Sequence, residues 1–168
     1  SPYHEAGGAP QTSDSFALLG IKDKLCRFVD ARDALMYNED TVAAYTEMAA
    51  KELPFWRAGN AKLEAALKSV PADRRDAAAR MLGLGKYCEC AIRTQNNLQR
   101  YWKAVVDKAP ETEVRKILDA EEANVRELMP YVEADSQLGW EPSMRYVTDP
   151  ECLRWKLGQL KSAPVKQP

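Results

Sequence analysis

The sequence lacks three features that would narrow its function at once: a long apolar run, an excess of charge of one sign, and a set of histidines. A helix that crosses a bilayer needs about 20 consecutive apolar residues, and no segment of this chain comes near that length. The 24 basic and 25 acidic residues give a net charge of −1, which argues against nucleic acid as a partner. We therefore expect a soluble protein that neither spans a membrane nor binds nucleic acid.

Histidine and cysteine are too few and too poorly spaced for a metal site or a disulfide framework. His4 has no second ligand near it, and the Glu-x-x-His motifs of a di-iron or di-manganese bundle are absent. Cys88 and Cys90 lie two residues apart in a helical pattern, so their side chains point apart, about 200° around the helix. With Cys26 and Cys152 they fit no small secreted scaffold. We expect free thiols, no metal and no cofactor.

The composition is that of one folded domain, with 45% apolar and 29% charged residues in a chain of 168. We divide the chain into an extended Gly- and Pro-rich lead-in over 1–13, a single helical domain over 14–162 and a tail over 163–168. The chain does not begin with Met, and its first residues lack the basic start and apolar centre of a signal peptide. We therefore expect a fragment or a processed product of a longer protein.

Apolar residues recur with a helical period along most of the chain, and no segment reads convincingly as a strand. The patterns predict helices from Ser13 or Asp14 to about 37, over about 41–69, 71–108 and 111–130, and a short last helix over 148–161 capped by Thr148 or Asp149. Pro54 should kink the second helix near 51–53 or break it in two. The expected fold is all-α: an antiparallel bundle of four long helices plus a short C-terminal helix, with one long ordered loop before it.

Two of the expected helices carry polar residues on their apolar faces. On the third, the expected buried face is Ala78, Met81, Leu84, Cys88, Ala91, Ile92, Gln95, Leu98, Trp102 and Val105. If the third and fourth helices turn near Ala109, residues at one level have numbers that sum to roughly 218. This register predicts a polar layer inside the bundle, formed by Gln95, Asn96, Glu121 and Asn124. The alternative is that the helices rotate enough for these groups to reach water.

The stretch VEADSQLGWEPSMRYVTDP, residues 132–150, interrupts the helical patterns. Aromatic rings stack on sugars and carboxylates bind sugar hydroxyls, so the candidate ligand-binding residues are Glu133, Asp135, Trp140, Glu141, Arg145 and Tyr146. A structural role competes with this one: Gly139 and Pro142 would shape a strap, and Trp140, Met144 and Tyr146 would close the end of the bundle. No spacing in the loop indicates a hydrolytic pair of carboxylates, so no catalytic residue is assigned and enzymatic activity stays open.

Three segments resemble a known family. VEADSQLGWEPSM (132–144), LRWKLGQL (153–160) and LGKYCECAIRTQNNLQRYW (84–102) are similar to the helical C-terminal region of large bacterial proteins that look like glycoside hydrolases. In such proteins the catalytic carboxylates are expected on a preceding barrel, so the resemblance implies an accessory module without catalytic residues of its own. It also implies a bacterial parent, for which secretion or a periplasmic location is an option that the sequence leaves open.

Two functions follow as hypotheses. The first is a non-catalytic helical accessory module of a bacterial carbohydrate-active protein, which packs on a neighbouring domain through its helix faces and the loop and lends Trp140 to the rim of a sugar site. The alternative is a self-standing helical module for protein–protein interaction or oligomerisation. The expected partners are a neighbouring domain of the same parent or another protein, with carbohydrate as a further candidate.

Overall fold

The computed structural model describes residues 39–138, 140–141, 145–146 and 149–163, which form four α-helices. The helices are α4 (Glu39–Leu67), α5 (Arg75–Val106), α6 (Glu111–Ala134) and α7 (Pro150–Ser162), with a short 3-10 turn η1 (Ala72–Arg74) before α5. The strands β1 (Trp140–Glu141) and β2 (Arg145–Tyr146) are two residues each. The all-α class is therefore confirmed, apart from a strand pair that the sequence did not predict. The lead-in over 1–13, the expected first helix and nearly all of the tail lie outside the described residues.

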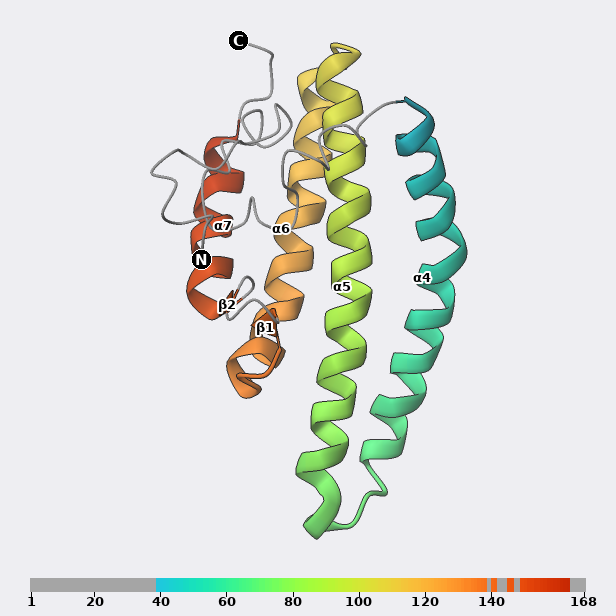
Figure 1. Cartoon of the computed structure of the whole chain (residues 1–168), viewed down its shortest axis with the longest axis vertical. Helices are drawn as coiled ribbons and strands as arrows, with labels where there is room; N and C mark the ends of the chain where they lie inside the picture. Colours follow the sequence, from blue (N-terminus) through green and yellow to red (C-terminus); the bar gives the residue numbers. More distant parts are fainter. Residues whose placement is uncertain (1–38, 139, 142–144, 147–148, 164–168) are drawn as a thin grey trace.

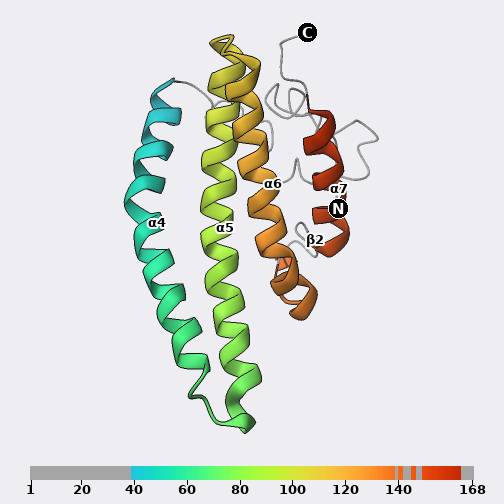
Figure 2. The same ribbon diagram turned by 180° about the vertical axis from the view of Figure 1, so that it is seen from behind.

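Consecutive helices lie side by side in the order α4, α5, α6, α7 (Figures 1 and 2). Contacts between α4 and α5 run in opposite directions along the two helices: Arg57 contacts Glu89, and the later residue Glu64 contacts the earlier Lys86. The chain turns between α5 and α6 at 107–110, where Lys108 has a positive φ of 53°. At their lower ends, α4 and α5 extend well beyond the end of α6 (Figure 1).

The apolar core lies between α5, α6 and α7. Its most deeply buried side chains are Cys90, Tyr101, Val114, Leu118, Val125, Cys152, Leu153 and Leu160. Helix α4 adds little to this core. Its buried side chains, among those described, are Val42, Ala49 and Asn60. Of the described helices, α5 is the one with which α4 makes extensive contacts. The described part of the chain is thus a three-helix unit with a long fourth helix lying on α5.

The buried face of α5 differs from the expected one. Met81 and Leu84 are 64% and 54% exposed, although both were expected inside. The buried face near them carries Leu82, Gly83 and Gly85 instead. The reason is that α5 has neighbours on two sides, α4 and α6, and Gly85 lets α4 come close. Large apolar side chains therefore do not identify the covered face.

Proline does not end the helices where the sequence predicted. Helix α4 continues through Pro54, so a break into two helices is wrong, and α6 continues through Pro130 to Ala134, four residues beyond its expected end. Both prolines are exposed, so the backbone carbonyl that each leaves without a helical partner can bind water. The expected start of the last helix is confirmed: Asp149 caps α7 by accepting a hydrogen bond from Cys152 N at 2.7 Å, with Pro150 as the first helical residue.

Replacing Gly85 by Ala should destabilise the fold, because the added Cβ would lie 2.2 Å from Asn60 Oδ1. Asn60 is buried and donates to Glu89 Oε2 at 2.8 Å, so moving it would break a buried hydrogen bond to a carboxylate. We expect a loss of about 1–3 kcal/mol in the free energy of unfolding, measured in urea. Gly59→Ala is the control, since nothing lies within 4 Å of its added Cβ; it should stabilise by about 0.5–1 kcal/mol. Similar effects of the two changes would contradict this close approach.

Candidate functional site

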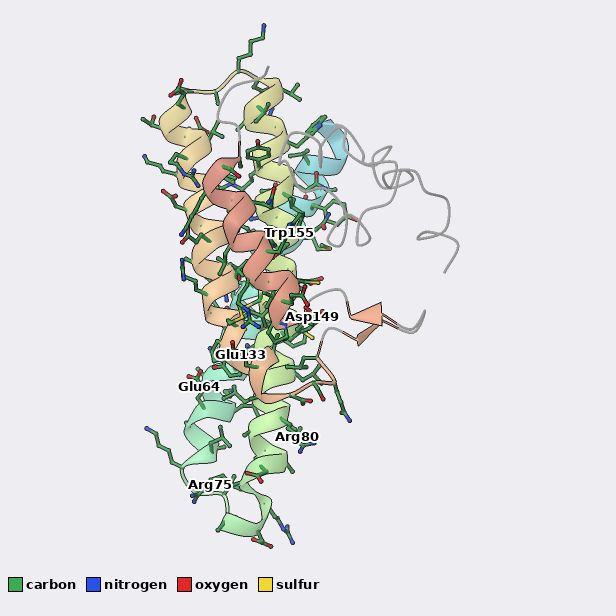
Figure 3. All side chains as sticks on the ribbon, turned by 90° about the vertical axis from the view of Figure 1, so that its left-hand side faces the viewer. Glu64, Arg75, Arg80, Glu133, Asp149 and Trp155 are labelled. Carbon is green, nitrogen blue, oxygen red and sulfur yellow. The ribbon has the colours of Figure 1, made fainter. Side chains whose placement is uncertain are left out.

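The candidate ligand-binding residues divide into those at the end of α6 and those on the short strands. Glu133 lies in the last turn of α6 and forms an exposed ion pair with Arg154 of α7 at 3.0 Å. Asp135 Oδ1 accepts a hydrogen bond from Gln137 N at 2.9 Å, which forms the turn after the helix. Both carboxylates therefore have local structural partners. Figure 3 shows Glu133 near the end of α6, with the first residues of α7 beside it.

The four remaining loop candidates lie on the paired strands. In the backbone register, Trp140 is opposite Tyr146 and Glu141 is opposite Arg145. This pairing brings together residues that are six and four apart in the sequence. Their side chains lie outside the described part of the structure, so their binding of a ligand stays a prediction.

One loop residue that sequence reasoning missed is docked on the helices. Leu138 is buried, and its Cδ1 lies 3.6 Å from the Cβ position of Gly83 in α5. Leu138 therefore packs against α5 at van der Waals distance from Gly83. The side chains of Trp140, Met144 and Tyr146, which were expected to close the end of the bundle, lie outside the described residues. In the stretch SQLG, Leu138 is the one large apolar residue, and this was the signal that could have identified it.

The polar layer is centred on Glu121. Its carboxylate is buried and accepts hydrogen bonds from Thr94 Oγ1 at 2.7 Å and Asn97 Nδ2 at 2.8 Å, both on α5. The ammonium group of Lys156, also buried, forms an ion pair with it from α7. A carboxylate in an apolar interior is costly unless it is paired and hydrogen-bonded. Glu121 meets both conditions and joins three helices through one side chain.

Asn124 lies one helical turn from Glu121 and links α6 to the α5 backbone. Its Nδ2 donates to Cys90 O at 2.9 Å and to Thr94 Oγ1 at 3.0 Å. Gln95 and Asn96 are half-buried, and Glu121 takes its hydrogen bonds from their neighbours Thr94 and Asn97. Of the four residues expected in the layer, the structure therefore brings Glu121 and Asn124 together. A functional role for this layer, in binding or in catalysis, stays a hypothesis.

The partners of Glu121 were missed for two reasons. Lys156 belongs to a helix far away in the sequence, and nothing in LRWKLGQL indicates that its lysine is buried. Thr94 and Asn97 are three residues apart and so share a face of α5, a spacing that could have identified them. With donors at both carboxylate oxygens, Glu121 is held in place by the fold.

A second buried carboxylate, Glu89, attaches α4 to α5. Its oxygens accept from Asn60 Nδ2 at 2.8 Å and Arg57 Nε at 3.4 Å, both on α4. Arg93 lies 3.5 Å from Glu89 and pairs more closely with Glu127 of α6, at 2.8 Å. The hydrogen bond from Arg93 lowers the pKa of Glu127 below its usual range. Charged side chains on α5 thus connect the helices on its two sides.

Two thiols lie on α5: Cys90 is buried and Cys88 is half-buried. Burial raises the pKa of Cys90 to about 11, although Arg93 Nη2 lies 3.2 Å from its Sγ. Burial also raises the pKa of Cys88, which is half-buried. No group of three or more His, Cys, Asp or Glu side chains in the described ranges is placed to hold a metal ion. Within those ranges, too, no helix combines the length and apolarity of a membrane span.

Replacing Lys156 by Met should destabilise the protein by about 3–5 kcal/mol, because Glu121 would stay buried without its cation. Removing both charges in the Glu121→Leu/Lys156→Met variant should cost less, about 1–3 kcal/mol, since Thr94 and Asn97 then lose only their acceptor. Chemical denaturation measures both. The control is Arg154→Met, which removes the exposed pair with Glu133 and should change stability by less than about 1 kcal/mol. Equal losses in the single and double variants would show that Lys156 does not compensate Glu121.

Alkylation of the folded chain should be faster at Cys88 than at Cys90. With its pKa at about 11, the Cys90 thiol is ionised to roughly one part in a thousand at pH 8, and the thiolate is the nucleophile. The Cys90 rate should rise about tenfold per pH unit up to pH 11 while the fold persists. Tandem mass spectrometry of iodoacetamide-treated protein separates the two sites, and the rates should become similar in denaturant. Equal rates in the folded chain would contradict the burial of Cys90.

No family model, no curated protein and no solved structure matches the chain. Its function therefore has to be inferred from its own residues.

Proposed function

We propose that this chain is a non-catalytic helical accessory module that packs on a neighbouring protein domain. The observation that supports this most is a group of large apolar side chains left exposed on α4 and α5. Phe55 is 79% exposed, Met81 64% and Leu84 54%, and Met48 and Trp56 are exposed as well. Single exposed apolar side chains are ordinary, but Met81 and Leu84 are three residues apart and share a face of α5, as Met48 and Phe55, seven apart, do on α4.

The exposed apolar residues are separate from the three-helix core. They lie on the two helices that are farthest from α7 (Figures 1 and 2). Helix α4 is long but buries few of its described side chains. The buried carboxylates, by contrast, have partners within the fold. Exposed apolar side chains on α4 and α5, beside carboxylates that are held by partners within the fold, favour a binding module over an enzyme.

The finer fold is part of the proposal. We infer an antiparallel bundle of four long helices, in which the amphipathic pattern before α4 supplies the remaining helix. Its apolar stripe, in the sequence alone, consists of Leu18, Ile21, Leu25, Phe28, Val29, Leu35 and Met36. The ordered loop before α7 is proposed to contact the same neighbouring domain.

The parent protein is proposed to be a bacterial carbohydrate-active, glycoside-hydrolase-like protein. This rests on the resemblance of 132–144 and 153–160 to the helical regions of such proteins. Trp140 would then lie at the rim of a sugar site formed mainly by the neighbouring domain. The alternative function, a self-standing module for protein–protein interaction or oligomerisation, is favoured by the same exposed side chains on α4 and α5.

Binding of the chain to the polypeptide encoded beside it tests the proposal. Isothermal titration should show binding, and Phe55→Ser/Leu84→Ser should weaken it at least about tenfold, because truncating two well-packed anchor residues at the centre of an interface costs more than about 1 kcal/mol each. Lys116→Ser, on the exposed face of α6, is the control and should leave the affinity unchanged. Absence of binding to that polypeptide would overturn the accessory role. Concentration-dependent light scattering that the double variant abolishes would favour the oligomerisation alternative.

A further inference from the structure

Pro54 divides α4 into two parts that are attached to α5 differently. Within the described part of the chain, the polar contacts between the two helices all lie after Pro54. They join Arg57 and Asn60 to Glu89, and Glu64 to Lys86. Among the described residues, the side chains of 42–53 form no hydrogen bond or ion pair with α5. The first part of α4 therefore lies on α5 (Figure 1) mainly through apolar side chains, of which Val42 and Ala49 are buried.

Two amide side chains of α5, Asn96 and Gln99, belong to the face that the first part of α4 covers. Glu89, Asn96 and Gln99 are seven and three residues apart on α5, so they share a face of the helix. Glu89 marks this face as the one toward α4, because Asn60 donates to it. The two helices run antiparallel, so the ten residues from Glu89 to Gln99 correspond to ten residues back from Asn60 along α4. This level is next to Ala49, which is buried.

The carboxamide of Gln99 is buried without a hydrogen-bond partner in the described part of the chain. Its side chain is 0% exposed, and neither Oε1 nor Nε2 is hydrogen-bonded. The Oδ1 atom of Asn96, one turn away, is buried and unpaired as well. A buried polar group without a partner costs free energy, which is recovered when the group reaches water. The closed position of the first part of α4 is therefore opposed by the amides that it covers, whereas Asn60 and Glu89 hold the second part in place.

We propose that residues 42–53 form a lid that opens from α5 at Pro54, while the part of α4 after Pro54 stays attached. Proline has no backbone N–H, so the carbonyl of Ala50 has no helical partner and the helix is weakest at this point. Opening gives the carboxamides of Asn96 and Gln99 access to water or to the peptide groups of a partner, since each offers a donor and an acceptor. This inference goes beyond the proposed function and does not depend on it, because the lid opens in the isolated chain.

Hydrogen exchange of the full chain measures the opening directly. A helical segment as short as the lid is only marginally stable in water once it leaves its neighbour, so its backbone amides exchange in the open state. Amides of residues 47–53 should exchange at least about tenfold faster than those of 58–64, after correction for intrinsic rates, because the lid opens without unfolding the remaining helices. Mass spectrometry of peptic fragments separates the two segments. Equal protection of both would overturn the inference.

Replacing Gln99 by Leu should keep the lid closed. Leucine is of similar size and needs no hydrogen bond, so exchange of residues 47–53 should slow at least about tenfold, with a smaller change in 58–64. Gln137→Leu makes the same substitution at an exposed position after α6 and should leave both segments unchanged. Faster exchange of 47–53 in Gln99→Leu would show that the amide has a partner in the closed state, such as a buried water, and would refute the lid.

Replacing Pro54 by Ala tests the position of the hinge. Alanine restores the missing hydrogen bond to the carbonyl of Ala50, so α4 should open as one unit. The ratio of the exchange rates of 47–53 and 58–64 should then fall at least about threefold. Pro130→Ala makes the same change inside α6 and should leave this ratio as it is in the unchanged chain. A ratio that Pro54→Ala does not alter would show that the helix does not open at Pro54, and the proposed lid would be wrong.

Discussion

The arrangement of α5, α6 and α7 depends on one buried carboxylate. Glu121 is paired with Lys156 and hydrogen-bonded by Thr94 and Asn97, so a side chain on the middle helix specifies both of its neighbours. An apolar core tolerates small rotations and shifts of its helices, whereas a buried charge loses several kcal/mol when its partners move away. Around this point the apolar side chains Tyr101, Leu118, Leu153 and Leu160 pack at full burial. The polar contacts define the alignment, and the apolar contacts supply the bulk of the stabilisation.

The attachment of α4 uses the same physical device at a second carboxylate. Glu89 is hydrogen-bonded by Asn60 and Arg57, and Gly85 allows the two helices to approach closely there. A helix held by polar contacts and a glycine buries little of its own apolar surface. Phe55 of α4 is exposed, and with Met81 and Leu84 of α5 it supports the proposed packing on another domain.

Several elements followed from local sequence alone, because their causes are local. The start of α6 at residue 111 and the capping of α7 near Asp149 agree with the predicted ranges. Their causes are Pro110 followed by acidic residues and Pro150 after Asp149. Glu121 and Asn124 could be placed among apolar neighbours because helical periodicity defines a face. The rotation of α5 and the pairing of Lys156 with Glu121 could not be predicted, because each depends on which side of a helix another helix covers.

The sequence by itself determined the class of fold, the approximate extent of the helices from α4 onward and the presence of carboxylates on their apolar faces. These properties depend on backbone preferences and on the cost of leaving apolar stripes in water. Only the tertiary structure decided that Lys156 neutralises Glu121 and that the stripe with Met81 and Leu84 faces outward. The physical reason is that a periodic pattern shows which residues share a face, whereas the burial of that face depends on contacts with helices remote in the chain.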